Sequence, residues 1–178
     1  FDDLYSDRFI DLTGPKNAIA PGIVASNVAG YDLRIVSSNT EPDAGIGIEP
    51  FIGETPIVYA YTNRGNTNLK FFELSVHDGR IFDLQSIDIT IDGSGDTQAK
   101  KVRLTGYRNG NPVNGAVMSK DVIDASAPGA SLVTYQTSLN SSFVGIDKIR
   151  IEPEGYDVSG AIGIDNVNAI NFRTPAGP

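Results

Sequence analysis

Tyrosine and arginine side chains that lie close together in this chain could bind a sugar. Tyr59 and Tyr61 alternate along one extended segment, Arg64 follows three residues later, and Tyr107 directly precedes Arg108. Aromatic rings offer flat apolar surface, and guanidinium groups hydrogen-bond to oxygen atoms. Alternate residues of a strand share a face, so Tyr59 and Tyr61 would line a groove on a concave sheet. These residues predict a carbohydrate site, and their basic neighbours suit an acidic polysaccharide; packing of the tyrosines into the core is the alternative.

Acidic and amide side chains near both ends of the chain could bind a calcium ion. Asp2 and Asp3 lie near the start, and Asp165 and Asn166 lie near the end. Calcium prefers carboxylate and carbonyl oxygens, and the termini of a domain often lie close together. We therefore expect one site formed by these four residues, the alternative being ordinary polar residues at strand ends.

Groups that could perform catalysis do not form a pattern. The chain has no cysteine, which excludes disulfides and thiolate chemistry, and its single histidine, His77, precedes an Asp-Gly turn signal. A catalytic histidine must be held beside a nucleophile, which an exposed turn rarely achieves. The 22 acidic residues leave a carboxylate dyad for glycoside hydrolysis open, but no spacing singles out a pair. We predict that the protein is not an enzyme.

The overall charge restricts the partners. A formal net charge of −8 argues against binding to nucleic acid, whose phosphates need a basic surface. The sequence has no run of apolar residues long enough to predict a membrane span. Loops rich in Asp and Asn fit a calcium-rich exterior, although solubility alone explains them equally well.

Short extended segments must position these residues. The 178 residues include 19 Gly and 10 Pro, and helical periodicity never persists beyond about two turns. Turn signals recur about every ten to fifteen residues, which is typical of a sandwich. We predict a single all-β domain over residues 1–173, with a linker remnant at 174–178. Its expected architecture is a two-sheet antiparallel β-sandwich of about ten strands, with jelly-roll topology.

The clearest extended segment spans residues 71–84. Apolar residues alternate with polar ones on both sides of Asp78-Gly79. This pattern predicts a β-hairpin with a three-residue loop and a left-handed Gly79, which sets Leu74 opposite Phe82. The apolar phase shifts after Leu84, which predicts a β-bulge at Gln85-Ser86.

Four segments occur in an order that resembles a known group of proteins: Phe1–Leu4, Gly79–Asp88, Leu104–Gly110 and Ile164–Val167. They are similar to bacterial exported β-sandwich domains found in PEP-CTERM-sorted surface proteins and in accessory modules beside secreted polysaccharide-degrading enzymes. The resemblance implies a galactose-binding-like jelly roll, carbohydrate binding, and a structural calcium held by the four terminal residues named above. The absence of tryptophan departs from the commonest sugar-binding pattern.

We therefore expect a non-catalytic carbohydrate-binding module of a secreted or cell-surface bacterial protein. It would bind a polysaccharide, carry a structural Ca²⁺ and act beside neighbouring domains of a longer chain. A structural or adhesive module without sugar binding is the alternative.

Overall fold

The computed structural model describes residues 23–28, 30–37, 44–50, 56–62, 69–92, 101–121, 133–136, 141–154 and 161–175. Every helix or strand in these ranges is a β-strand, which confirms the all-β prediction. The strands are β1 (Ile23–Val28), β2 (Tyr31–Ser37), β3 (Ala44–Pro50), β4 (Pro56–Thr62), β5 (Leu69–Val76), β6 (Ile81–Asp92), β7 (Lys101–Arg108), β8 (Asn111–Asp121), β9 (Val133–Gln136), β10 (Lys148–Glu154) and β11 (Ala161–Arg173).

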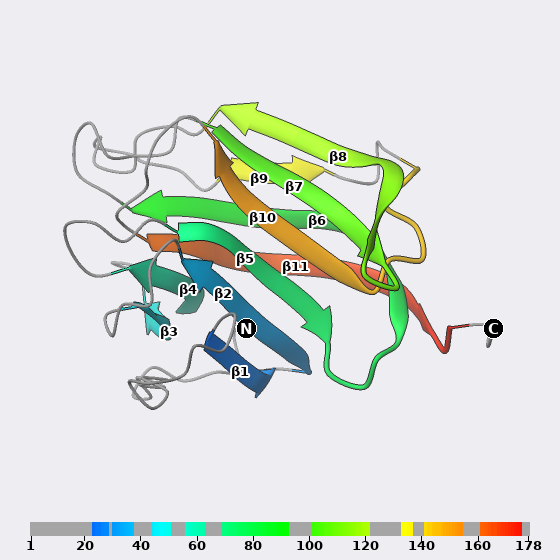
Figure 1. The fold of residues 1–178 in the computed structure, drawn as a ribbon, viewed down its shortest axis with the longest axis horizontal. Helices are drawn as coiled ribbons and strands as arrows, with labels where there is room; N and C mark the ends of the chain where they lie inside the picture. The colour runs from blue at the N-terminus through cyan, green and yellow to red at the C-terminus, as the bar shows by residue number, and fades with distance from the viewer. Residues whose placement is uncertain are drawn as a thin grey trace.

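The strands form two antiparallel sheets that lie face to face (Figure 1). The six-stranded sheet has the order β1-β2-β5-β10-β7-β8, and the five-stranded sheet has the order β3-β4-β11-β6-β9. Only the connections β1–β2, β3–β4 and β7–β8 join strands of the same sheet, so the chain repeatedly crosses the sandwich. The two-sheet antiparallel β-sandwich is confirmed, whereas the jelly-roll topology stays a prediction.

Residues 71–84 do not form the predicted hairpin. Strand β5 pairs with β2 and β10, and β6 pairs with β11 and β9, so the two strands lie in different sheets. The turn between them crosses the sandwich, and its Gly79 amide donates to the Val76 carbonyl over 3.0 Å. Gly79 has the predicted positive φ, 75°. The hairpin prediction was wrong because Leu74 and Phe82 face the core in either arrangement. The alternation of apolar and polar residues indicates which face of a strand is buried, but not which strand it pairs with.

The predicted bulge is present. Ser86 lies opposite Asn168 and Leu84 lies opposite Ala169, so Gln85 is an extra residue on β6. Leu84 and Ile87 are consequently both buried, as their apolar character requires.

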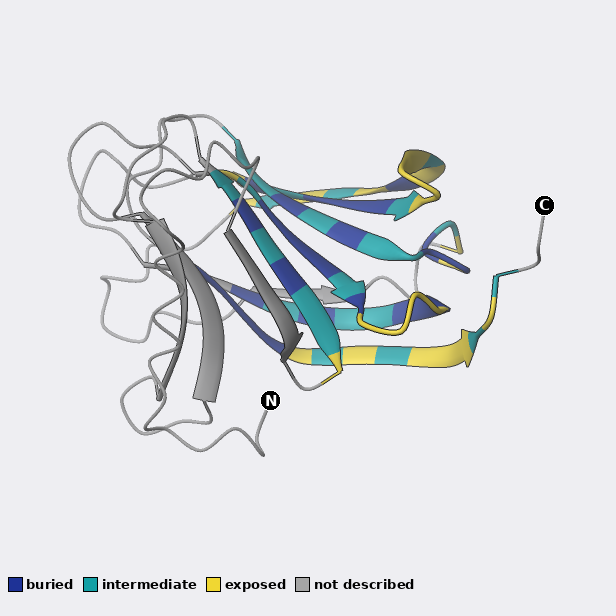
Figure 2. Ribbon diagram, turned by 60° about the horizontal axis from the view of Figure 1, so that its bottom comes forward, coloured by how far each residue is buried: buried dark blue, intermediate teal, exposed yellow. Residues whose placement is uncertain are grey.

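The core fills the space between the sheets, where buried residues alternate with less buried ones along the strands (Figure 2). Each large side chain removed from water contributes about 1.5–3 kcal/mol. The core residues of the six-stranded sheet include Leu33, Ile35, Phe72, Leu74, Leu104, Ile149 and Ile151. Those of the five-stranded sheet include Phe82, Leu84, Ile87, Ile89, Ile162 and Ile164.

Residues 141–147 close one end of this core. Ile146 and Phe82 exchange two backbone hydrogen bonds of 2.8 and 2.9 Å, and Phe143 is also buried. This segment packs directly on β7, because a Cβ atom at Gly106 would lie only 3.0 Å from Cγ2 of Ile146. A side chain at position 106 would force the segment outward.

Candidate functional site

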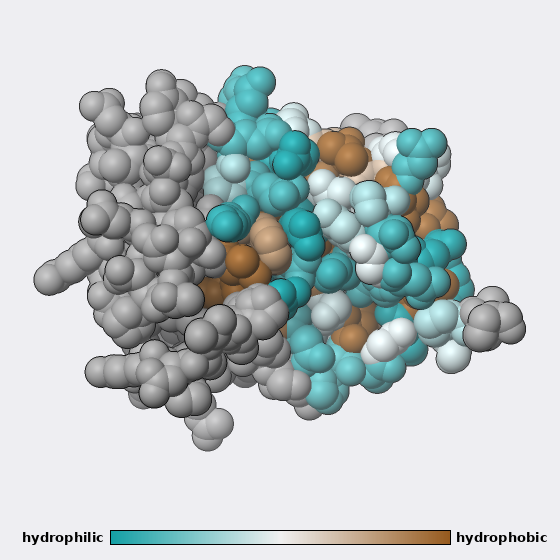
Figure 3. Space-filling model, in the orientation of Figure 1, coloured by the Kyte–Doolittle hydropathy of each residue, from teal (hydrophilic) through white to brown (hydrophobic). Residues whose placement is uncertain are grey.

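The outer face of the six-stranded sheet carries a group of charged and aromatic side chains in contact with one another. Inward-facing apolar residues alternate with outward-facing polar ones, as in an antiparallel sheet with one face toward solvent. The register aligns Arg34, Glu73, Arg150 and Thr105 in one row across four strands. The neighbouring row contains Lys148 beside Tyr107. Figure 3 views this side of the molecule, where the described surface is mainly hydrophilic with small hydrophobic patches.

Glu73 lies at the centre of this group and is only 3% exposed. Its Oε1 atom lies 2.7 Å from Nη2 of Arg150 and 3.2 Å from Nζ of Lys148, and Nε of Arg150 donates to the same oxygen over 2.8 Å. Its Oε2 atom lies 3.2 Å from Nη1 of Arg34. A buried carboxylate needs such partners, because an unpaired buried charge is very costly.

Two aromatic rings contact the same cations through their faces. The Cζ atom of Arg150 lies 4.0 Å from the centroid of the Phe71 ring and 4.7 Å from that of Tyr107. The Nζ atom of Lys148 lies 5.1 Å from the Tyr107 ring. These are cation–π distances, so the cations are fixed by rings as well as by the carboxylate. We call the six residues Arg34, Phe71, Glu73, Tyr107, Lys148 and Arg150 the basic–aromatic face.

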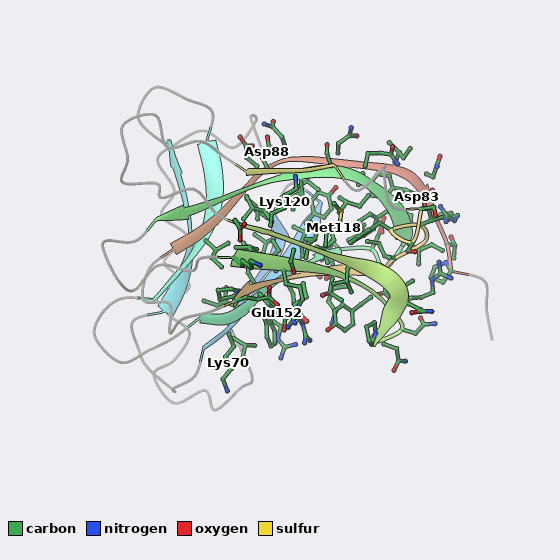
Figure 4. All side chains as sticks on the ribbon, turned by 90° about the horizontal axis from the view of Figure 1, so that it is seen from above. Lys70, Asp83, Asp88, Met118, Lys120 and Glu152 are labelled. Atoms are coloured by element: carbon green, nitrogen blue, oxygen red, sulfur yellow. The ribbon has the colours of Figure 1, made fainter. Side chains whose placement is uncertain are left out.

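A group of ion-paired residues borders the basic–aromatic face. Arg103 donates from Nε to Glu152 over 3.1 Å, and its Nη1 atom lies 3.0 Å from Glu154. The side chain of Arg103 is 41% exposed, so these are surface ion pairs. In Figure 4, Glu152 and Lys70 lie on one side of the sandwich and Asp88 lies on the other.

Asp83 is a second buried carboxylate, 7% exposed, on β6. Its Oδ1 atom accepts from the Gly145 amide over 2.7 Å and from Arg173 over 2.9 Å, and its Oδ2 atom accepts from Asn171 over 2.8 Å. Burial opposes ionisation of Asp83, but these hydrogen bonds outweigh it and lower its pKa below the ordinary value. Asp83 therefore ties residues 141–147 to β6 and β11.

The predicted ligand residues on described strands are divided between the two sheets. Tyr59 and Tyr61 belong to β4 of the five-stranded sheet, whereas Tyr107 belongs to β7 of the six-stranded sheet. Arg64 lies outside the described residues.

Arg108 is attached to the core-closing segment rather than to the basic–aromatic face. It donates from Nη2 to the carbonyl of Val144 over 3.0 Å and from Nε to the carbonyl of Gly145. Adjacent strand residues point to opposite faces, so Tyr107 and Arg108 could not share one. Among the predicted ligand residues that the structure describes, Tyr107 lies on the basic–aromatic face and Arg108 does not.

Sequence reasoning missed Phe71, Glu73, Lys148 and Arg150 as site residues. A usable signal was present: Lys148 and Arg150 alternate with the buried Ile149 and Ile151, which places both cations on one outward face. Their convergence with Phe71 depends on the pairing of β10 with β5, which alternation does not reveal.

Part of the predicted calcium site is described. The Asn166 amide donates to Oδ1 of the buried Asp165, and Nδ2 of Asn166 donates to Oδ2 of Asp88 on the neighbouring strand, both over 2.8 Å. Asp2 and Asp3 lie outside the described residues. Within the described ranges, no group of three or more His, Cys, Asp or Glu side chains is arranged to hold a metal. The four-residue site stays a prediction.

His77 lies at the turn between β5 and β6. Its Nδ1 atom lies 2.7 Å from Oδ1 of Asp32, and its amide donates to the Gly30 carbonyl over 2.9 Å. These contacts tie the crossing turn to β2 and to the turn that precedes it.

Comparison with known proteins adds no family. Neither the models of known protein families nor the curated proteins include a match to this chain. No helix among the described residues is long and apolar enough to cross a membrane. The placement of side chains on the sandwich is therefore the basis for inferring a function.

Proposed function

We propose that this chain is a non-catalytic carbohydrate-binding module, and that it binds a polysaccharide on the basic–aromatic face. The observation that carries the proposal is the position of Arg150, whose guanidinium group lies against the rings of Phe71 and Tyr107 while it contacts Glu73. Sugar recognition needs apolar surface next to hydrogen-bonding groups, and this face offers both on one outer sheet surface.

The rigidity of this face supports the proposal. Arg150 and Lys148 are held by a buried carboxylate and by aromatic rings, so they lose little conformational freedom when a ligand binds. The strands beneath them are paired on both sides, since β10 lies between β5 and β7. A binding surface on paired strands is held more precisely than one on a loop.

The proposed role is to keep a neighbouring domain close to its polysaccharide. A module linked to a second domain raises the effective concentration of that domain at the substrate. The proposal therefore includes a secreted or cell-surface location and a longer bacterial protein in which this domain has neighbours.

We also propose a structural calcium at Asp165 and Asn166, with Asp2 and Asp3 as further ligands. Thermal unfolding with calcium and with a chelator, at matched ionic strength, tests this site. A ligand that binds only the folded state adds ~2.7 kcal/mol at a hundredfold excess over its dissociation constant. An unchanged melting temperature would refute the site.

Affinity electrophoresis in gels that contain single polysaccharides tests the proposed function. We expect retarded migration in at least one glycan, and we expect Tyr107→Ala to weaken the retardation about tenfold, since stacked aromatic contacts contribute about 1–2 kcal/mol. Phe172→Ala is the matched control, because Phe172 is an exposed ring that packs on Phe82 in the five-stranded sheet. Equal losses in both variants would contradict the proposed face. Normal migration in every glycan would favour a structural or adhesive module.

A further inference from the structure

We propose that the basic–aromatic face selects an anionic glycan, whose carboxylate or sulfate groups bind between Lys148 and Arg150. This inference rests on the proposed carbohydrate binding and adds the chemical class of the ligand. The overall net charge of −8 gives no hint of such a preference, so the inference depends on local charge.

The local charge is unbalanced. Lys148 and Arg150 carry two positive charges, and both contact a single oxygen of Glu73. Among the described residues, no second carboxylate is paired with either cation. Arg34 contacts the other oxygen of Glu73. Neutralising one buried carboxylate requires one cation, and the excess positive charge favours binding of a further anion.

The charged residues that border the basic–aromatic face are paired differently. Arg103 is paired with both Glu152 and Glu154, so the adjoining region carries more negative than positive charge. Asp32, in the same row as Lys148, lies beside His77. The described charges around Arg103 and Asp32 therefore do not extend the positive charge of the basic–aromatic face.

The setting of the two cations strengthens their attraction for an anion. Their side chains are 22% and 23% exposed, so much of each is already shielded from water by Glu73 and the aromatic rings. Electrostatic interactions are stronger where less water surrounds the charges. Arginine also presents a planar fork of donors that matches carboxylate and sulfate oxygens.

The test compares each acidic glycan with an uncharged counterpart of the same backbone. The pairs are polygalacturonate with its fully methyl-esterified form, and dextran sulfate with dextran; polyglutamate serves as a polyanion without sugar. Binding is measured by calorimetry in about 150 mM salt, where the Debye length of about 8 Å limits repulsion from distant acidic residues. We expect at least one acidic form to bind about tenfold or more tightly than its uncharged counterpart.

Two variants test whether Lys148 and Arg150 cause the preference for the acidic glycan. The double change Lys148→Gln and Arg150→Gln is expected to abolish the preference for the acidic form, at a loss of about tenfold or more. Arg103→Gln is the matched control on the same sheet but outside the basic–aromatic face, and we expect less than about a twofold change because Arg103 is already neutralised. Melting temperatures show whether each variant is folded. If the double variant does not fold, the glycan pairs measured on the unaltered chain still decide the question.

Each outcome separates this inference from the proposed function. Equal binding of charged and uncharged forms, or binding of neutral glycans alone, would refute the anionic preference and leave carbohydrate binding intact. No binding to any glycan would refute both. Equal binding of polyglutamate would show a general polyanion surface and would also refute the inference. An equal loss for Arg103→Gln would show that Lys148 and Arg150 have no special role.

Discussion

Glu73 and Asp83 are buried carboxylates in different sheets of the sandwich, and their surroundings differ in charge. Asp83 has one cation, Arg173, together with an amide side chain and a backbone amide as neutral donors. Glu73 is contacted by three cations from two neighbouring strands. Both carboxylates have hydrogen-bonding or ionic partners, yet Asp83 is balanced in charge whereas Glu73 is not.

The origin of the partners separates a structural carboxylate from one that organises a binding surface. The partners of Asp83 come from β11 and from residues 141–147, so Asp83 attaches to β6 a segment that lies outside the named strands. Two of the partners of Glu73 lie beside it on β10, and β10 is already held by backbone pairing. Asp83 should therefore matter most for stability, and the cations around Glu73 should matter most for ligand binding.

Replacement of Asp83 should have the largest effect on stability. Asp83→Ala removes the acceptor for Gly145 and Arg173, and we expect the free energy of unfolding to fall by about 2–4 kcal/mol. Urea unfolding measures the loss. Asp78→Ala is the control, because its pair with Arg80 is exposed on both sides and should contribute less than about 1 kcal/mol. Similar losses in both variants would contradict the structural role of Asp83.

Replacement of Glu73 should have a smaller effect. Glu73→Gln removes the shared negative charge, but Arg34, Lys148 and Arg150 are partly exposed and can turn toward water. We therefore expect a loss of about 1–3 kcal/mol in the free energy of unfolding. A loss greater than that of Asp83→Ala would show that the comparison between the two carboxylates is wrong.

Acidification should reduce the contribution of Asp83. Its pKa is lower in the folded chain than the ordinary value of about 3.9, so its stabilisation is fully present above that value. The contribution is lost as the pH falls through the lowered pKa, by about 1.4 kcal/mol for each unit of difference. The difference in unfolding free energy between the unaltered chain and Asp83→Asn should be constant above about pH 5 and should shrink below about pH 4. A difference independent of pH would contradict the lowered pKa.

Replacement of Arg103 should have the smallest effect. Its ion pairs with Glu152 and Glu154 lie at the surface, so Arg103→Gln should change the free energy of unfolding by less than about 1 kcal/mol. Urea unfolding of Arg103→Gln and of Arg150→Gln gives the free energy of unfolding of each variant. The comparison shows whether Arg103, which pairs with two carboxylates, and Arg150, which shares Glu73 with Lys148, contribute differently to stability. A larger loss for Arg103→Gln would indicate that the ion pairs of Arg103 with Glu152 and Glu154 are structurally important.

Two similar turn signals show why pairing was harder to predict than burial. Asp78-Gly79 and Asn109-Gly110 both lie between alternating segments. Asn109-Gly110 closes a hairpin in one sheet, with φ of 51° and 76°, and Arg108 lies opposite Asn111. The turn at Asp78-Gly79 crosses to the other sheet. A two-residue turn with both φ values positive matches the twist of paired strands, whereas the longer turn does not impose pairing.

The candidate site was predictable only in part for the same reason. Tyr107 could be placed on an outward face from its neighbours, but its grouping with Tyr59 and Tyr61 needed a common sheet that the strand order does not provide. The cations were visible as an alternating pair at Lys148 and Arg150. Their meeting with Glu73 required the register between β10 and β5, which links residues 77 positions apart.

The strand class, the inward positions and the bulge at Gln85 could be predicted from the sequence alone, because they follow from the two-residue period of a strand and from local turn chemistry. The sheet that each strand joins depends on the tertiary fold. Strand partners are chosen by packing among segments far apart in the chain, and the same inward face is buried whichever sheet receives the strand. The basic–aromatic face and its excess of positive charge depend on this strand order, which places β2, β5, β10 and β7 side by side.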